Sequence, residues 1–294
     1  MSTPRFLDLP PGVRRTDLPT PFGTVAALSA VPAAGGCELQ PAVLVPGYTG
    51  SKEDFIALLQ TLAQAGRSVT AIDLPGQYES PGLADPLLYT LDGLGAAVAE
   101  VVVALDQGPV HLAGHSFGGL VCRDTVLAGQ VPLISLTLMS SGPAAVGGAR
   151  ATDARNLAAV LGDRPTGERL REVWTQHLDA LARGKGVPDE IYAFLRDRML
   201  ANDPYALTRM ADTLVSAPDR TLELAATGLP TLVLYGEDDD AWPPEVQAAM
   251  AKDLGARRVV VPGATHSPNV EAPETTAGAL TAFWNASETP ERTA

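Results

Sequence analysis

The sequence predicts an α/β protein with a mostly parallel β-sheet and helices on both faces of that sheet. Short apolar runs recur along its 294 residues, and a helix-like segment follows most of them. The runs are apolar at successive positions, which is typical of strands buried on both faces. The alternation breaks only between residues 144 and 217, where no clear strand pattern is present. We therefore expect a sheet domain that carries a helical insertion.

The regular alternation begins near the N-terminus. The segment 20–32 has the pattern of a hairpin arm and predicts an antiparallel edge. Ser51 is a candidate N-cap, with Asp54 in an acidic first turn. The apolar runs predict strands at 42–47, 68–76, 110–116 and 133–142, and the segments after the first three predict helices at 51–66, 89–107 and 117–129.

The second half of the chain resumes this alternation after the insertion. Within the insertion, helical patterns separated by Gly and Pro occupy 169–184, 190–200 and 205–217. An insertion of this length fits a lid better than a plain connection. Beyond it, strands are predicted at 231–239 and 257–266, and a last helix at 273–286.

The run VHLAGHSFGG places Ser116 between a predicted strand and a predicted helix, inside a Gly-x-Ser-x-Gly pattern. A serine on such a sharp turn presents its hydroxyl group at the edge of the sheet. Gly114 and Gly118 remove side chains that would collide with neighbouring elements. The positive end of the helix dipole then lies below the serine oxygen, where it favours developing negative charge. Ser116 is therefore our candidate nucleophile.

Four histidines could serve as the base that accepts the serine proton. His111 lies too early in its strand, and the side chain of His115 is expected to point away from its neighbour. His177 falls in the insertion, where an exposed helical histidine is the better interpretation. His266 follows a predicted strand, at the edge where active sites of open α/β sheets gather. We predict that His266 is the base.

An acidic cluster follows the strand predicted at 231–239. Neighbouring carboxylates raise each other's pKa, so they would not all be buried in the charged form. We expect one to turn inward and orient the histidine, and the others to stay in water. The candidates are Glu237, Asp238, Asp239 and Asp240.

Two backbone N–H groups are candidates for an oxyanion hole. One is that of Phe117, the residue after the candidate nucleophile, and the other is that of Tyr48, in the loop after the strand at 42–47. Gly47 would let this loop approach closely, whereas Pro46 has no N–H to donate.

The amino-acid composition limits the classes of binding partner and the cellular compartment that we expect. A net charge of −13 argues against nucleic acid and anionic membranes, which attract basic surfaces. No apolar run approaches the roughly 18 residues needed to span a bilayer, and no signal peptide is visible. Cys37 and Cys122 are best interpreted as free thiols of a reducing compartment. We expect a cytoplasmic protein with no metal, no organic cofactor and no readable oligomeric state.

These pieces resemble the α/β-hydrolase superfamily over nearly the whole chain. The matching segments, in the family's order, are VLVPGYTGSKEDF, IDLPGQYES, GHSFGG, LVLYGEDDDAWPP and GATHSPNVEAPE. The resemblance implies an eight-stranded type of sheet, with Ser116 as nucleophile and His266 as base. It also implies Asp239 as the acid, and favours Tyr48 and Phe117 as oxyanion donors. It divides the chain into a core domain at 1–143 and 218–294 and a helical cap at 144–217.

The chain departs from the family pattern at two loops. Pro46-Gly47 stands where many relatives have His-Gly, so the hydrogen bonds of that histidine are absent. The segment PGQYES at 75–80 replaces the usual Arg-Gly-His-Gly-x-Ser loop, which alters the loop and substrate entry. The nucleophile is Ser rather than Asp, which argues against dehalogenase and epoxide-hydrolase chemistry.

The sequence thus predicts a serine hydrolase that cleaves a carboxylic ester, or a related acyl bond, of a small to medium apolar substrate through an acyl-enzyme. Carboxylesterase is the first expectation. A peptidase of the proline-iminopeptidase kind, a carbon–carbon bond hydrolase, a lactonase, a cofactor-free perhydrolase and an acyltransferase use the same groups. A ligand-binding pseudoenzyme on this scaffold is the alternative of a different class. Possible cap residues around the pocket are Trp174, Tyr192, Phe194 and Met210, although ordinary packing explains each better.

Overall fold

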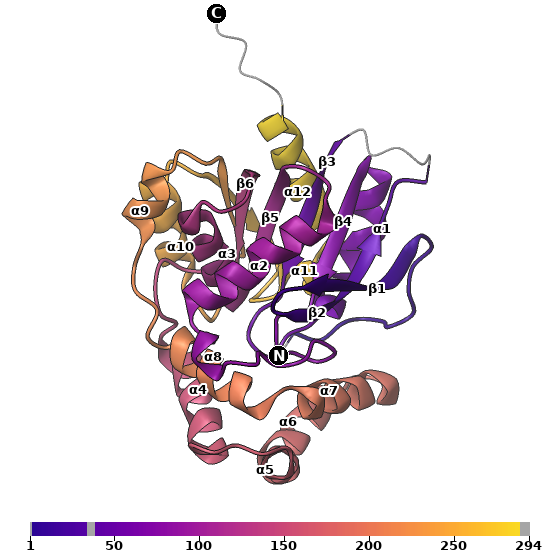
Figure 1. Cartoon of the computed structure of the whole chain (residues 1–294), viewed down its shortest axis with the longest axis vertical. Coiled ribbons are helices and arrows are strands. Elements are labelled where there is room, and N and C mark those ends of the chain that lie inside the picture. The colour runs from indigo at the N-terminus through magenta and orange to yellow at the C-terminus, as the bar shows by residue number, and fades with distance from the viewer. Residues whose placement is uncertain (1, 34–38, 289–294) are drawn as a thin grey trace, which may run out of the picture.

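The computed structural model describes residues 2–33 and 39–288, so Cys37 lies outside the described residues. Within these ranges, eight strands form one sheet in the order β1-β2-β4-β3-β5-β6-β7-β8 (Figure 1). The pairs β1–β2 and β2–β4 are antiparallel, and the other neighbours are parallel. The strands are β1 (Val13–Thr20), β2 (Gly23–Ala30), β3 (Leu39–Val45), β4 (Arg67–Ile72), β5 (Val110–His115), β6 (Leu133–Met139), β7 (Thr231–Gly236) and β8 (Arg257–Val261).

Burial along the strands follows the sequence pattern. Every residue of β4, β5 and β7 is buried, as expected for strands covered on both faces. Strand β1 is mostly exposed and forms a hairpin with β2, in which Thr20 pairs with Gly23. The predicted class, a mostly parallel sheet with an antiparallel edge, is confirmed.

Helices cover both faces of the sheet. One face packs against η1 (Lys52–Phe55), α1 (Ile56–Gln64), α11 (Pro268–Glu271) and α12 (Pro273–Glu288). The other packs against α2 (Leu91–Leu105), which follows η2 (Pro86–Leu88), and against α3 (Phe117–Ala128), α9 (Thr221–Ala226) and α10 (Pro244–Asp253). Each face therefore buries its own cluster of apolar side chains, and the sheet is held between them.

Between β6 and α9 the chain is helical and forms the layer below the sheet in Figure 1. Its elements are α4 (Gly148–Leu161), α5 (Gly167–Val173), the π-turn η3 (Trp174–Leu178), α6 (Asp179–Arg183), α7 (Asp189–Ala201) and α8 (Pro204–Leu214). The sequence pattern predicts the segments of α5 to α8. It does not single out α4, because that helix is rich in Ala, carries polar residues on most of its surface and has only a narrow apolar face.

A buried ion pair joins this helical layer to η1, the short helix that packs on the sheet. The guanidinium of Arg198, on α7, is fully buried and donates from Nη1 to Asp54 Oδ1 at 2.7 Å. Its Nη2 donates to the backbone carbonyl of Ser2 at 2.7 Å. The N-terminal segment therefore lies at the junction of the two layers, as Figure 1 shows.

Several strands end earlier than the apolar runs suggest. The runs ending at 76, 142, 239 and 266 stop as strands at Ile72, Met139, Gly236 and Val261. The residues beyond these points form turns at the carboxyl edge of the sheet. In the part of the chain that the structure describes, no helix combines the length and the apolarity needed to cross a membrane.

Candidate active site

Ser116 sits at the turn between β5 and α3. Its backbone has φ 55° and ψ −122°, a left-handed conformation that is strained for a residue with a side chain. Its N–H donates to the carbonyl of Met139 at 2.8 Å, which ties the turn to β6. A Cβ on Gly114 would lie 2.2 Å from the Gly118 carbonyl oxygen. The tight packing of β5 against α3 therefore requires glycine and holds the strained serine in place.

His266 follows β8 and its ring lies beside Ser116. Its Nε2 is 3.0 Å from Ser116 Oγ and its Nδ1 is 2.9 Å from Asp239 Oδ1. The three side chains come from the ends of three different parallel strands. The fold thus brings together the serine, histidine and aspartate that the sequence singles out, in a continuous hydrogen-bonded chain.

Asp239 is the buried member of the acidic loop, 4 % exposed, whereas Glu237, Asp238 and Asp240 are exposed. Its Oδ1 also accepts the Ala241 N–H at 2.9 Å, and its Oδ2 accepts Gln247 Nε2 at 2.9 Å. Burial by itself raises the pKa of Asp239. The hydrogen bonds and the positive field of His266 outweigh burial, so the pKa lies below its ordinary value. Asp239 is therefore held as a carboxylate.

Gln247 is a site residue that the sequence analysis does not find. It lies on α10, is fully buried, and donates both to Asp239 and to the carbonyl of Trp242 at 2.7 Å. A buried glutamine eight residues after the acid has no distinctive sequence signal. Its role depends on α10 folding back over the acidic loop.

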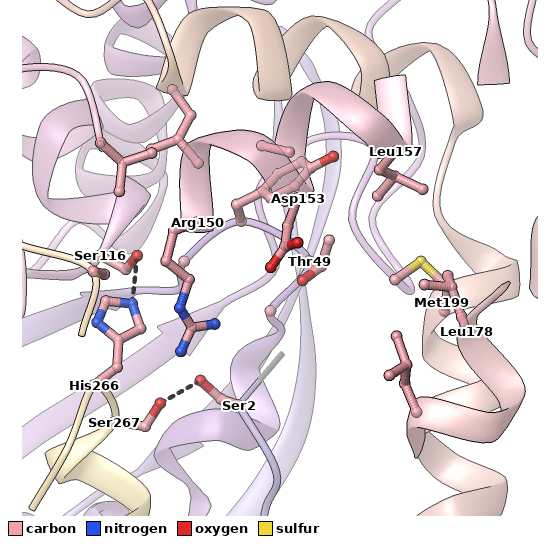
Figure 2. A pocket seen from close by; sticks show the side chains of 18 of the residues that line it. Ser2, Thr49, Ser116, Arg150, Asp153, Leu157, Leu178, Met199, His266 and Ser267 are labelled. Atoms are coloured by element: carbon pink, nitrogen blue, oxygen red, sulfur yellow. Dashed lines mark hydrogen bonds between the residues drawn. The ribbon is translucent and has the colours of Figure 1, made fainter. Parts of the chain in front are cut away.

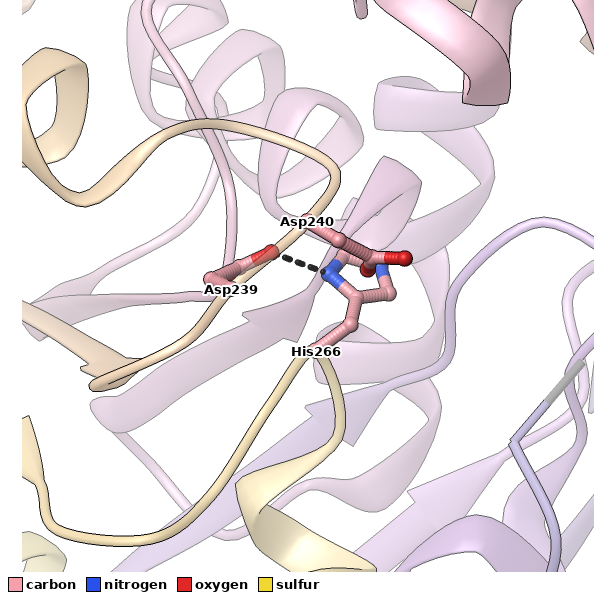
Figure 3. Close-up of side chains that lie close together, drawn as sticks. All are labelled: Asp239, Asp240 and His266. Atoms are coloured by element: carbon pink, nitrogen blue, oxygen red, sulfur yellow. Dashed lines mark hydrogen bonds and ion pairs between the residues drawn. The ribbon is translucent and has the colours of Figure 1, made fainter.

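Asp240 makes a different contact. Its two carboxylate oxygens accept from Nη2 of Arg150, on α4, at 2.8 and 3.0 Å. Asp239, Asp240 and His266 each offer one ligand atom within 4.8 Å of the others, which is a geometry that can hold a metal ion (Figure 3). However, both ring nitrogens of His266 and both carboxylates already have protein partners. The donor set fits the observed hydrogen-bond network better than a cation site.

His115, directly before Ser116, is 2 % exposed and donates from Nε2 to the backbone carbonyl of His266 at 2.8 Å. Burial, together with the nearby ring of His266, lowers the pKa of His115 to about 4. The ring is therefore neutral at pH 7. Because its acceptor is a carbonyl, Nε2 carries the proton and Nδ1 is left as a buried acceptor without a partner.

The loop after β3 lies against the serine. A Cβ on Gly47 would be 3.0 Å from Ser116 Cβ and 3.3 Å from His115 Nδ1. Gln77, in the loop at 75–80, donates from Nε2 to the Gly47 carbonyl at 2.9 Å. This hydrogen bond ties the loop at 75–80 to the loop after β3.

The two predicted oxyanion donors belong to the residues that follow Gly47 and Ser116 in the chain. Phe117 opens α3, where a backbone N–H has no acceptor within its own helix. The N–H of Tyr48 has no hydrogen-bond acceptor within the described residues. The Tyr48 hydroxyl donates to the carbonyl of Leu207, on α8, at 3.0 Å. Burial and the nearby charge of Asp212 raise the pKa of Tyr48 well above its ordinary range.

The other histidines lie elsewhere. His111 is fully buried on β5, between Ser135 and Glu288. Burial lowers the pKa of His111 to about 4. His177 lies on η3 and lines the cavity described below, at a position exposed to solvent.

A cavity of about 750 Å³ opens above Ser116 and His266, between the sheet edge and the helical layer (Figure 2). Most of its wall is apolar. The four residues suggested as possible cap lining, Trp174, Tyr192, Phe194 and Met210, do not line it. Its apolar wall comes instead from Val146, Ala154, Leu157, Val160, Val173, Leu178, Leu181, Met199, Leu214 and Trp242.

The chain is similar to known enzymes in sequence and in structure. It is 38% identical over 109 residues to a dihydrolipoyllysine-residue acetyltransferase component of an acetoin cleaving system from Pseudomonas putida, covering 36% of this chain but only 28% of that protein. It is 30% identical over 242 residues to a non-heme chloroperoxidase from Burkholderia pyrrocinia, covering 71% of this chain and 78% of that protein.

Among solved structures, a thermophilic esterase from Thermogutta terrifontis superposes with a TM-score of 0.71 at 24% identity, covering 94% of this chain and 100% of the esterase. This likeness concerns the fold. The family model described as the alpha/beta hydrolase family matches residues 42–279. The match spans β3 to α12 and every element that carries the hydrogen-bonded chain of Ser116, His266 and Asp239. The protein is a member of the alpha/beta hydrolase family.

Proposed function

We propose that the protein is a serine hydrolase that cleaves a carboxylic ester, or a related acyl bond, of a largely apolar substrate. The observation that carries the proposal is the hydrogen-bonded chain from Ser116 Oγ through His266 to Asp239, which opens into an apolar cavity. A serine joined to an imidazole, which is in turn held by a carboxylate, is the arrangement that activates a hydroxyl nucleophile.

In the first half of the reaction, Ser116 Oγ attacks the acyl carbon while His266 Nε2 takes the serine proton. The electron pair of the acyl C=O bond moves onto its oxygen, which becomes an oxyanion. His266 then gives the proton to the leaving group as the bond to that group breaks, which leaves an ester of Ser116. In the second half, water attacks this ester and His266 takes the water proton. The acid departs, and the proton returns to Ser116 Oγ.

Asp239 and the backbone donors support these steps. The Asp239 carboxylate accepts from His266 Nδ1, so Nε2 faces the serine without a proton and the imidazolium that forms is stabilised. The N–H groups of Tyr48 and Phe117 would hold the oxyanion.

The helices at 144–217 would act as a cap that shapes the substrate pocket. Carboxylesterase activity fits the mostly apolar wall of the cavity best. Lactonase, peptidase, carbon–carbon hydrolase, perhydrolase and acyltransferase activities would use the same reacting atoms. They differ in the group that leaves or in the molecule that attacks the acyl-enzyme.

Labelling with a fluorophosphonate tests the nucleophile directly. We expect stoichiometric modification of Ser116 in the wild-type protein and none in Ser116→Ala. The same variant should lose hydrolysis of a simple aryl ester by at least about 10⁴-fold. A wild-type protein that is not labelled would indicate a ligand-binding pseudoenzyme. A Ser116→Ala protein with full activity would show that Ser116 is not the nucleophile.

A screen of esters, amides and lactones, with and without an added alcohol, tests the substrate class. We expect esters with medium apolar acyl groups to react fastest and water to be the preferred acceptor. Faster cleavage of amides, or ester products formed with the alcohol, would identify a peptidase or an acyltransferase instead.

A further inference from the structure

The cavity has two unlike ends and a polar section between them. Figure 2 shows Ser116 and His266 at one end and Leu157, Leu178 and Met199 at the other. Thr49, Arg150 and Asp153 lie between the two ends and also line the cavity. We call these three residues the polar collar. A substrate that reaches from the serine to the apolar end must pass it.

Thr49 contributes a hydroxyl from the sheet side of the cavity. Its φ of 59° is unusual for a β-branched residue, for which a left-handed backbone is strained. The residue is only 6 % exposed, yet its hydroxyl has no hydrogen-bond partner among the described residues. An unpaired hydroxyl in a largely buried position costs free energy, and a polar ligand in the cavity would offset that cost.

Asp153 and Arg150 contribute opposite charges from α4. The carboxylate of Asp153 makes no ion pair or hydrogen bond with the described residues. Arg150 is 37 % exposed and pairs with Asp240 through Nη2 alone, which leaves its Nε and Nη1 donors for a ligand. The two opposite charges lie one helical turn apart, so a charged ligand group near one of them is also near the other. Arg150 would repel an ammonium group, and Asp153 would repel a carboxylate.

The collar therefore complements an uncharged group that both donates and accepts hydrogen bonds. A secondary amide meets this requirement, because its N–H can donate to Asp153 while its carbonyl accepts from Arg150 or Thr49. A hydroxyl group can do the same with a single oxygen.

We infer that the polar collar is a subsite for a secondary amide or hydroxyl group, set between the scissile bond and an apolar tail that fills the end at Leu157, Leu178 and Met199. The inference rests on the proposed function and names the substrate class more closely. The substrate is an ester or lactone with an amide or hydroxyl group a few atoms from the reacting carbonyl, followed by an alkyl chain.

Matched pairs of esters test the subsite. In one pair, the ethyl ester of N-hexanoylglycine is compared with ethyl nonanoate, which has the same chain length. In the other, the acetate of N-hydroxyethyl hexanamide is compared with nonyl acetate. We expect kcat/KM to favour the amide by about tenfold or more in at least one pair, because a hydrogen bond to a charged group contributes about that factor.

Variants then assign the preference to the collar. Asp153→Leu and Thr49→Val should each bring the ratio of kcat/KM for the amide ester to kcat/KM for the alkyl ester toward one. Thr49→Val keeps the β-branched shape and removes only the hydroxyl. Arg155→Leu is the matched control, since Arg155 lies on the same helix, is exposed and does not line the cavity. It should leave the ratio unchanged.

Titration calorimetry of Ser116→Ala with the same esters gives the ratio as Kd values and does not depend on turnover. The measurements can therefore reject the subsite while the hydrolase assignment holds, or reject the hydrolase assignment while the subsite holds. A wild-type ratio near one in both pairs, in kcat/KM and in Kd, would overturn the inference. A ratio that persists in Asp153→Leu and in Thr49→Val would also overturn it.

Discussion

The carboxyl edge of the sheet and the helical layer that faces it are built in opposite ways. At the sheet edge, Ser116, His266 and Asp239 lie beyond the carboxyl ends of three parallel strands and are joined by hydrogen bonds. In the helical layer, polar groups such as Asp153 face the cavity without protein partners. A preorganised edge suits a fixed set of reacting atoms, whereas unpaired groups suit recognition of a ligand. Under the proposed function, the chemistry belongs to the sheet edge and substrate choice to the helices.

The largest effect on kcat should come from a change at Asp239, the acid of the hydrogen-bonded chain. Asp239→Asn keeps the shape of the side chain but can hold His266 in the wrong tautomer, so kcat should fall by about 10⁴-fold. Asp238→Asn, on the exposed part of the same loop, is the matched control and should stay within twofold of wild type, roughly the spread of a neutral surface change. Steady-state kinetics on an aryl ester measures both. Equal losses in the two variants would contradict the special position of Asp239.

The next effect concerns how the helical layer is held on the sheet. Arg198→Met leaves the buried carboxylate of Asp54 without its partner, which should lower the free energy of unfolding by about 3–5 kcal/mol. Arg196→Met, an exposed change on the same helix, should cost less than about 0.5 kcal/mol. Urea unfolding measures both values.

The double variant Asp54→Asn/Arg198→Met should recover part of the loss, because it no longer buries an unpaired charge. If Arg198→Met unfolds like wild type, the ion pair does not hold the two layers together.

His115 should make a pH-dependent contribution of up to about 3 kcal/mol to the free energy of unfolding. Its pKa is lowered to about 4 in the folded protein, from an ordinary value of 6.5. Between these values the unfolded chain binds the proton and the folded chain does not. Stability from this residue is therefore full above pH 6.5 and is lost as the pH falls toward 4.

Unfolding of wild type and His115→Gln at pH 7 and pH 4.5 isolates this contribution, because every other titrating group is common to both proteins. The stability advantage of wild type over the variant should shrink at the lower pH. Parallel pH profiles would show that His115 is not held neutral by burial.

The smallest effect should come from His115 as a positioning residue for His266. His115→Met removes the donor to the His266 carbonyl and should lower kcat, and the rate of fluorophosphonate labelling of Ser116, by about tenfold with little change in KM. His115→Gln places an amide N–H near the position of Nε2 and should restore most of the rate. If both variants lose the same activity, the residue serves packing alone.

Much of this arrangement can be predicted from the sequence because it depends on local patterns. Doubly apolar runs identify the buried strands, and turn residues identify where they end. Ser116 directly follows such a run, and His266 lies a short turn beyond the strand Arg257–Val261, so their place at the sheet edge can be inferred without coordinates. Choosing Asp239 among four adjacent acids required the family resemblance, since local sequence does not say which carboxylate turns inward.

The residues that the sequence analysis missed depend on contacts between distant segments. Gln247 reaches Asp239 only because α10 packs behind the acidic loop, and Gln77 meets Gly47 only because two loops cross. Helix α4, which carries Arg150 and Asp153, has a weak apolar pattern and is held in place by its neighbours. None of these features has a short sequence signature.

The sequence by itself determined the class of the fold, the order of its central strands along the chain and the position of Ser116 and His266 at the sheet edge. These follow from hydrophobic periodicity and turn chemistry, which act over a few residues. Only the tertiary structure decided which carboxylate is buried, which amide supports each loop and which cap residues line the cavity. Those choices depend on packing between segments that lie far apart in the sequence, such as Tyr48 and Leu207, which are 159 residues apart.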